Sequence, residues 1–346
     1  LSAVEQPGLP WTTGHSWAIG VSWAIGGSVK GYQRQYFPGL IRLSQAQTVT
    51  KGTRTDNGQP VIVAVLDTGI DPSHPAFAGR LVPGYDFVSN DADPSEEGIL
   101  RQNPVYGHGT HVAGIVAMVA PEAKIMPVRV LDTDGSGELW RVTAAIIWAA
   151  NHGADVINIS FGYNSSPDLL KDLLDNCDGT PPEGTKTFPE MLRQVAVIAG
   201  AGNGGNSSPI FPAGNRIDAQ LGVGATTRYD HLWEFSTMSV GTSGSDRFIR
   251  AVAPGENIIS SIPGGRYAMW SGTSMAAPIA AGVAALVRAK FPALTPNQIV
   301  SQIAETGISW DCTHPTRGEI KTNRVDAYCA VTNDRSCGIN AHACDQ

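Results

Sequence analysis

The sequence is poor in charged residues, which make up 16% of its 346 residues, and acids outnumber bases. There are 31 Asp and Glu against 24 Lys and Arg, and the formal net charge is −7. The basic residues are scattered along the chain. A nucleic-acid partner needs a clustered positive surface that contacts phosphates. We therefore expect no nucleic acid among the partners.

Long apolar runs are also missing. The stretch 278–287 is apolar and small, but it is only about half as long as the roughly 20 residues that a membrane span needs. The first residues lack the basic start and the apolar core of a secretory signal. We therefore expect no membrane association. Either the numbering begins after a removed signal, as in a mature secreted protein, or there was none.

Cysteine is scarce, with five in the chain and no CxxC pair, so a structural zinc site is poorly supported. Four of them, Cys312, Cys329, Cys337 and Cys344, crowd the C-terminal end. They could form two disulfides, and the pairing local in sequence is Cys312–Cys329 with Cys337–Cys344. The alternative is reduced thiols. Cys177 is then left as an odd thiol.

The sequence does contain a regular alternation of strand and helix patterns. Short apolar runs rich in β-branched residues predict strands at 61–66, within 123–131, and at 156–160, 195–199 and 221–225. Helices are predicted at 111–119, 139–151, 273–291 and 295–305, with shorter pieces at 169–174 and 189–194. This alternation predicts the α/β class, with a parallel β-sheet flanked by helices on both faces.

No linker divides the middle of the chain, so the sequence predicts one domain with two tails. Residues 1–38 are interpreted as an N-terminal arm or the remnant of a pro-segment. The domain itself is expected over 39–328. Residues 329–346 are expected to form a Cys-containing C-terminal tail.

Three segments carry residues that can do chemistry. Asp67 directly follows a buried strand, where an acid is costly unless it has a partner. His108 lies in the run Gly-His-Gly-Thr-His at 107–111, and Ser274 lies at the start of a long helix, where negative charge is favoured. Taken singly, each has an ordinary alternative: a turn Asp, a structural His, and a helix-capping Ser.

Other hydrolase patterns fit less well. An aspartic protease needs two carboxylates that share a proton, and only one Asp-Thr-Gly follows a strand. The metalloprotease pattern with its Glu is absent around His108. An α/β-hydrolase elbow would need Gly where Ala276 stands.

In the order Asp, His, Ser, the blocks 63–71, 108–114 and 272–278 resemble the subtilisin-like serine proteases, or subtilases. The resemblance covers most of the chain, from about residue 40 to about 326. It implies a subtilisin-like three-layer fold and a serine endopeptidase that works through an acyl-enzyme intermediate. Ser274 would be the nucleophile, His108 the general base, and Asp67 the residue that orients His108. The second histidine of the block, His111, falls on a position that is structural in the family.

The block 197–204 resembles the family segment that stabilises the oxyanion. Asn203 would donate from its side-chain amide, together with the backbone N–H of Ser274. Gly200, Gly202 and Gly205 also match a dinucleotide-binding pattern, but that pattern needs a helix to follow, and Pro and Ser follow here instead.

Subtilases bind substrate as an extended strand between two edge segments. The resemblance places the substrate-binding residues at Gly135, Ser136, Gly137, Leu139, Ser160, Phe161, Gly162, Gly200, Ala201 and Gly202. None of these stretches contains an acid. We therefore expect broad specificity, with an apolar or aromatic side chain preferred just before the cut.

The sequence departs from the family at its calcium sites. One family ligand is an acid where this chain has Ala76, the calcium-binding loop after the catalytic His is absent, and Arg250 stands at the weaker cation site. We therefore predict no metal-ligand set at these positions and no required cofactor. Calcium at a non-standard site is left open, because acids also gather in 91–97 and 132–134.

The resemblance implies protein or peptide substrates, and a cleaved pro-segment acting as an inhibitor is a further partner to consider. We expect a secreted monomer. Two alternatives stay open: a catalytically idle module of the same fold used for binding, and a processing peptidase with a single target. The presence of the whole triad with Asn203 favours an active enzyme.

Overall fold

The structure is a computed structural model that describes residues 24–100, 102–164, 194–215, 217–239, 247–314 and 318–336, with the backbone alone for 24–27, 310–314 and 318. Some predictions fall outside these residues. They concern the helical piece 169–174, all but the last residue of the piece 189–194, and the side chains of Cys177, Cys312, Cys337 and Cys344.

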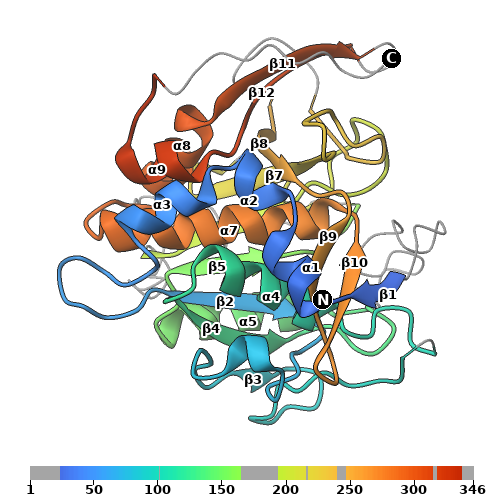
Figure 1. The fold of residues 1–346 in the computed structure, drawn as a ribbon. Helices are drawn as coiled ribbons and strands as arrows, with labels where there is room; N and C mark the ends of the chain where they lie inside the picture. Colours follow the sequence, from blue (N-terminus) through green and yellow to red (C-terminus); the bar gives the residue numbers. More distant parts are fainter. Residues whose placement is uncertain are drawn as a thin grey trace, which may run out of the picture.

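Within the described residues, the main sheet has nine strands in the order β11-β12-β8-β7-β6-β5-β2-β4-β3 (Figure 1). Its strands are β2 (Ile62–Asp67), β3 (Tyr85–Asp86), β4 (Lys124–Arg129), β5 (Val156–Ile159), β6 (Ala196–Gly200), β7 (Gln220–Thr226), β8 (Ile249–Pro254), β11 (Ile308–His314) and β12 (Gly318–Arg324). The strands from β3 to β12 pair in parallel, and only β11 and β12 pair antiparallel among these strands.

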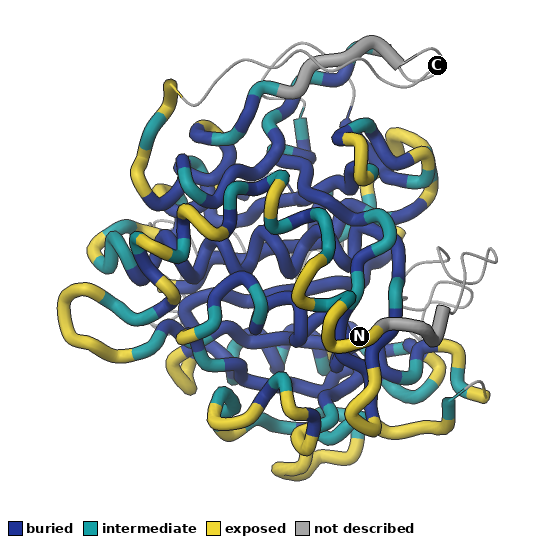
Figure 2. The backbone as a smooth tube through the Cα atoms, in the orientation of Figure 1, coloured by how far each residue is buried: buried dark blue, intermediate teal, exposed yellow. Residues whose placement is uncertain are grey.

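Helices cover both faces of the sheet. Along β2, Val63 and Val65 belong to one apolar core, while Ala64 and Leu66 belong to the other. The first core contains residues of α4 (His108–Val119), α7 (Thr273–Lys290) and α8 (Pro296–Thr306), and the second contains residues of α5 (Leu139–Asn151). A strand buried on both faces needs no polar side of its own, which explains its unbroken apolar run. Figure 2 shows the buried residues gathered along the sheet and α7. The predicted α/β class is confirmed.

Helix α7 runs through the middle of the molecule (Figure 1), packed against the sheet and α4. The close approach of the two helices depends on a glycine. A Cβ added at Gly282 would lie 2.5 Å from the Cβ of Val119 on α4. Since carbon atoms do not approach so closely, glycine is required for this spacing.

Several described elements were not predicted from the sequence. They are a three-stranded sheet of β1 (Ala24–Gly27), β10 (Arg266–Trp270) and β9 (Ile258–Ile262), the helices α1 (Val29–Arg34), α2 (Phe37–Leu40), α3 (Leu43–Val49) and α9 (Ala327–Thr332), the short 3-10 helix η3 (Pro75–Phe77), and the strands β3, β8, β11 and β12. The four longer predicted helices, which fall within the described residues, are present as α4, α5, α7 and α8, with α4 beginning at His108 rather than at residue 111.

The N-terminal segment packs onto the domain. The Tyr32 hydroxyl donates to the carbonyl of Gly114 on α4 at 2.6 Å, and Gln35 exchanges two hydrogen bonds with the backbone of Ile259 on β9. At the other end, Cys329 on α9 is fully buried and takes part in a disulfide. Its partner sulfur lies outside the described side chains, so the pairing stays a prediction.

Candidate active site

Asp67 is the last residue of β2, at the carboxyl end of the parallel strands, where loops of such sheets carry reactive groups. Its side chain is almost fully buried. Its Oδ1 accepts hydrogen bonds from His108 Nδ1 at 2.7 Å and from the backbone N–H of Thr68 at 2.8 Å. A buried carboxylate with two donors is a stable arrangement, whereas an isolated one is not.

His108 is the first residue of α4. The preceding Gly107 caps the helix with φ 89°, a left-handed conformation that favours glycine, and it turns the chain so that His108 faces Asp67. Because Asp67 accepts from Nδ1, that nitrogen carries the proton, and Nε2 is left as the basic nitrogen of the neutral ring. The indole of Trp270 lies parallel to the imidazole, with ring centroids 6.2 Å apart.

Ser274 lies in the first turn of α7, next to the end of β5. Its hydroxyl donates to the carbonyl of Ser160 at 2.8 Å, and the hydroxyl of Ser160 donates to the carbonyl of Ser274 at 3.0 Å. The second bond has a simple cause. Pro278, inside α7, has no N–H, so the Ser274 carbonyl four residues earlier lacks its helical donor. Ser160 supplies that donor and thereby holds the turn that carries Ser274.

Asn203 follows β6, beside the start of α7. Its Oδ1 accepts from the backbone N–H of Thr273 at 2.9 Å and from the Thr273 hydroxyl at 3.1 Å. The carbonyl end of the amide is thus turned toward Thr273, and Nδ2 is its donor end. Because Thr273 precedes Ser274, the amide is anchored to the same turn as the candidate nucleophile.

The edge segment at 135–137 is a tight turn held by Asp132. Asp132 N–H donates to the carbonyl of Ser136 at 2.8 Å, and Asp132 Oδ1 accepts from the N–H of Ser136 at 3.0 Å. Both backbone polar groups of Ser136 are therefore used inside the turn. The N–H of the flanking Gly135 is also used inside the turn, where it donates to the carbonyl of Asp132 at 3.0 Å.

Two further predicted substrate-binding glycines, Gly162 of the second edge segment at 160–162 and Gly202 after β6, have a packing reason. A Cβ added at Gly162 would lie 2.3 Å from a methyl carbon of Ile210, and one at Gly202 would lie 2.5 Å from another carbon of the same side chain. Gly202 also has φ 98°. Glycine at these two positions is thus required by the neighbouring loop, whether or not substrate approaches.

The other predicted substrate-binding residues lie mostly inside the domain. Leu139 is 8% exposed and Phe161 3% exposed, and both belong to the core on the α5 face. Gly200 ends β6, and the N–H of the next residue, Ala201, donates to the carbonyl of Val223 on β7. These residues are buried in the domain and do not form a freely exposed surface.

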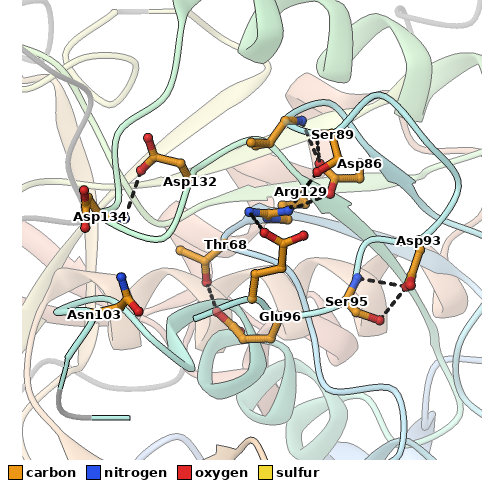
Figure 3. A network of polar contacts seen from close by, with 12 residues as sticks. Thr68, Asp86, Ser89, Asp93, Ser95, Glu96, Asn103, Arg129, Asp132 and Asp134 are labelled. Carbon is orange, nitrogen blue, oxygen red and sulfur yellow. Dashed lines mark hydrogen bonds and ion pairs between the residues drawn. The ribbon is translucent and has the colours of Figure 1, made fainter. Parts of the chain in front are cut away.

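A carboxylate that sequence reasoning did not connect with the site lies behind Asp67 and His108. Glu96 accepts from the hydroxyl of Thr68, which directly follows Asp67 (Figure 3), and from the hydroxyl of Thr110, two residues after His108. The sequence placed Glu96 among acids that could bind calcium. The signal that could have identified it is the pair of threonines one residue after Asp67 and two residues after His108.

The two family calcium positions do not fit a calcium ion in this chain. Ala76 lies in the 3-10 helix η3 and offers no side-chain oxygen. Helix α4 continues unbroken to Val119, and β4 begins soon after. Arg250 brings a positive charge to the weaker site, where its guanidinium donates to the Asp218 carbonyl and the Ser301 hydroxyl. Across the described residues, no group of three or more His, Cys, Asp or Glu could hold a metal.

In the part of the chain that the structure describes, no helix combines the length and the apolar character needed to span a membrane.

Comparisons with known proteins identify the family of the chain. A model of the subtilase family matches residues 58–329. The chain is 38% identical over 314 residues to a thermophilic serine proteinase of Bacillus sp. (strain AK1), which covers 88% of this chain and 68% of that protein. It is 34% identical over 308 residues to thermitase of Thermoactinomyces vulgaris, covering 86% of this chain and 96% of thermitase.

Among solved structures, a cold-adapted subtilisin-like serine proteinase superposes with a TM-score of 0.59 at 28% sequence identity. The alignment covers 82% of this chain and 97% of that protein. The likeness therefore extends over nearly the whole of the solved enzyme.

Proposed function

The chain belongs to the subtilase family and is a subtilisin-like serine endopeptidase, and on this premise we propose that Asp67, His108 and Ser274 are its catalytic triad, with Asn203 as oxyanion donor. The observation that carries the proposal is the hydrogen bond of 2.7 Å between Asp67 and His108. It joins the end of a parallel strand to the first turn of a helix, with both side chains almost fully buried.

In the proposed reaction, Ser274 Oγ attacks the carbonyl carbon of the peptide bond while His108 Nε2 takes the hydroxyl proton. In the structure that hydroxyl donates to the Ser160 carbonyl, so the proton has to be redirected to His108 before attack. Asp67 keeps its negative charge and stabilises the imidazolium that forms.

The tetrahedral intermediate carries a negative oxygen. Asn203 Nδ2 and the backbone N–H of Ser274 would donate to it. The C–N bond then breaks, and His108 gives its proton to the leaving amine, which leaves an ester on Ser274. Water attacks this ester with His108 as base, the carboxylic acid departs, and Ser274 regains its proton.

For specificity we propose an apolar or aromatic residue just before the cut, with broad tolerance elsewhere. The support is the lack of any acid in 160–162 and 200–202, where a carboxylate would be needed to pair with Arg or Lys. Cleavage of matched peptides with Phe, Leu or Arg at this position tests the proposal. A preference for Arg would overturn it.

We further propose that the substrates are proteins or peptides and that the enzyme is secreted as a monomer. The disulfide at Cys329 supports an oxidising compartment. Subtilases commonly bind calcium. Because the two family positions lack suitable ligands here, we propose that no cofactor is required at them; calcium in the loops 91–97 or 132–134 stays untested.

A serine-directed phosphonylating probe tests the central proposal. We expect the wild-type protein to be labelled at Ser274 and to lose peptidase activity in proportion to labelling. Ser274→Ala should be neither labelled nor active, while its circular dichroism stays that of the wild type. Activity that persists in a folded Ser274→Ala variant would refute the assignment.

A further inference from the structure

Glu96 lies in a loop whose path is fixed against the segment that follows Asp67. The N–H of Ile70 donates to the carbonyl of Pro94 at 3.0 Å, and the N–H of Glu96 donates to the carbonyl of Ile70 at 2.9 Å. Between them, a Cβ added at Gly69 would lie 2.7 Å from the carbonyl oxygen of Ser95. The backbone of Glu96 is therefore held beside the candidate active site.

The carboxylate of Glu96 contacts one threonine on each side. Oε1 accepts from the hydroxyl of Thr68 at 2.6 Å. Oε2 accepts from the hydroxyl of Thr110 at 2.9 Å and from its backbone N–H at 3.2 Å. Figure 3 shows the first of these contacts, with Glu96 reaching toward Thr68.

Both hydroxyls also accept a hydrogen bond from the backbone. Thr68 Oγ1 accepts from the N–H of Gly109 at 2.9 Å, and Thr110 Oγ1 accepts from the N–H of Asp71 at 2.9 Å. A hydroxyl that accepts from an N–H turns its own proton elsewhere. Both hydroxyl protons thus point at the side chain of Glu96. This favours the ionised carboxylate of Glu96, which accepts hydrogen bonds and donates none.

These contacts join the two segments that carry Asp67 and His108. Thr68 follows Asp67, and its backbone N–H donates to the Asp67 carboxylate. Gly109 and Thr110 follow His108 in the first turn of α4. A carboxylate that holds both segments therefore controls how Asp67 and His108 face each other.

The electrostatic surroundings make this carboxylate sensitive to pH. Burial, and then the nearby charge of Asp67, raise the pKa of Glu96 to about 7, against the hydrogen bonds that favour its charged form. Besides Asp67 at the end of β2, Tyr106 in the loop before α4 faces it. Arg129 pairs with Asp86 and Glu97 and forms no ion pair with Glu96 among the described residues.

We propose that Glu96 is a positioning residue of the peptidase site, whose carboxylate holds Thr68 and Thr110 and thereby fixes Asp67 against His108 for catalysis. The inference rests on the proposed triad. It extends that proposal to a residue that touches neither substrate nor the reacting atoms.

Glu96→Gln tests the inference, because it keeps the shape but turns an NH₂ group toward donors. We expect kcat to fall about 10- to 100-fold, since displacement of a catalytic group by about 1 Å can cost about 100-fold, with KM within about 2-fold. The midpoint of the acidic limb of kcat/KM should also move to lower pH. Gln removes a group that must be ionised, and it removes a negative charge that favours protonated His108.

The neighbouring Glu97 supplies the matched control. Glu97 is 53% exposed and pairs with Arg129 on the far side of the loop. Glu97→Gln should leave kcat and the pH profile unchanged. Glu96→Asp keeps the carboxylate and should recover part of kcat and the wild-type position of the acidic limb.

Several outcomes would overturn the inference. One is a Glu96→Gln variant with wild-type kcat. Another is a kcat lowered equally at every pH, together with a lower Tm, which would mean a purely structural role. If Glu96→Gln does not fold, Glu96→Asp decides: an acidic limb displaced from its wild-type position, although a carboxylate is kept, counts against the inference.

Failure of the triad proposal would look different. In that case the wild type would be inactive, or Ser274→Ala would stay active. If the wild type is active, Ser274→Ala is inactive and Glu96→Gln matches the wild type, the inference about Glu96 alone is wrong.

Discussion

The buried His111 should make stability depend on pH in a way that one substitution removes. His111 is fully buried on α4, its ring stacks on Trp270 with centroids 4.4 Å apart, and its Nε2 donates to the carbonyl of Ala268 at 3.2 Å. Burial, and then the proximity of His108, lower the pKa of His111 from 6.5 to about 3. The hydrogen bond to Ala268 opposes this shift only in part.

The sign follows from proton binding. Between pH 6.5 and about 3, the unfolded chain binds a proton on His111 that the folded chain does not bind. The free energy of unfolding therefore falls as the pH falls through this window. With a shift of this size, the contribution of His111 decreases by about 2 kcal/mol between pH 7.5 and 5, since one pKa unit corresponds to about 1.4 kcal/mol.

Glu96 acts in the opposite direction over part of the same range. Its pKa is raised from 4.5 to about 7, so the folded chain holds a proton there that the unfolded chain has lost. This stabilises the fold as the pH falls toward 4.5. The wild-type curve alone is then not diagnostic, and the difference between variants has to be measured.

His111→Phe keeps a ring against Trp270 and does not titrate. We expect its free energy of unfolding to fall by about 2 kcal/mol less than that of the parent between pH 7.5 and 5. The loss of the bond to Ala268 lowers stability by an amount that does not depend on pH. Urea denaturation followed by circular dichroism measures both, in a Ser274→Ala background that prevents self-digestion.

His152 offers a close control. It stacks on Trp148 with centroids 3.9 Å apart and bonds to the Trp148 carbonyl, but unlike His111 it is exposed. His152→Phe should leave the pH dependence unchanged. The reasoning is refuted if His111→Phe and its parent lose stability in parallel between pH 7.5 and 5.

Two further substitutions probe the oxyanion donor and the helix packing. Asn203→Ala should lower kcat about 100- to 1,000-fold with little change in KM. As a control, Asn206→Ala in the exposed loop nearby should match the wild type in peptide hydrolysis. Equal kcat for the two variants would exclude Asn203 as an oxyanion donor. Gly282→Ala should destabilise the fold by about 1–3 kcal/mol, because its Cβ would meet Val119. Gly39→Ala, with no atom within 4 Å of the added Cβ, should be neutral or stabilising by about 0.4–1 kcal/mol in urea denaturation. A neutral Gly282→Ala would contradict the packing argument.

The strands at the centre of the sheet were predictable because burial on both faces leaves an unmistakable sequence. The run at 61–66 contains no polar residue and appears as β2, shifted by one residue. Asp67 directly after it was noticed for the same reason. The long helices α5, α7 and α8 are also close to their predicted ranges, since each has enough turns for apolar residues to recur.

The elements that were missed are short or interrupted. Arg250 breaks the apolar run of β8, so the strand does not stand out. Helices α1, α2 and α3 have 6, 4 and 7 residues. They are too short for apolar residues to recur recognisably at helical spacing, and too short to be stable alone. They form because of tertiary contacts, such as the pair of hydrogen bonds between Gln35 and Ile259. A partner 224 residues away leaves no local signal.

The residues proposed to react are visible in the local sequence, whereas the residues that position them depend on tertiary contacts. Asp67, His108 and Ser274 lie in contiguous motifs, because a reactive group needs a particular strand end or helix start around it. Pro278, by contrast, is a residue that usually breaks helices, and the sequence shows no more than that. Only the fold shows that the Ser160 hydroxyl donates to the carbonyl of Ser274, which Pro278 leaves without a helical donor.

Glu96 and Glu97 show how sharp this limit is. The two are adjacent and chemically equivalent in sequence, and both appeared as acids of a solvated loop. The parallel bridge between Ile70 and Ser95 aligns the loop with the chain after Asp67, so that Glu96 turns inward to Thr68 and Glu97 turns outward to Arg129. Since a shift of one residue in that bridge would exchange their roles, the supporting residue is determined by the pairing of two loops. Local pattern does not encode that pairing, and for this reason the two glutamates are the most direct experimental comparison that this fold offers.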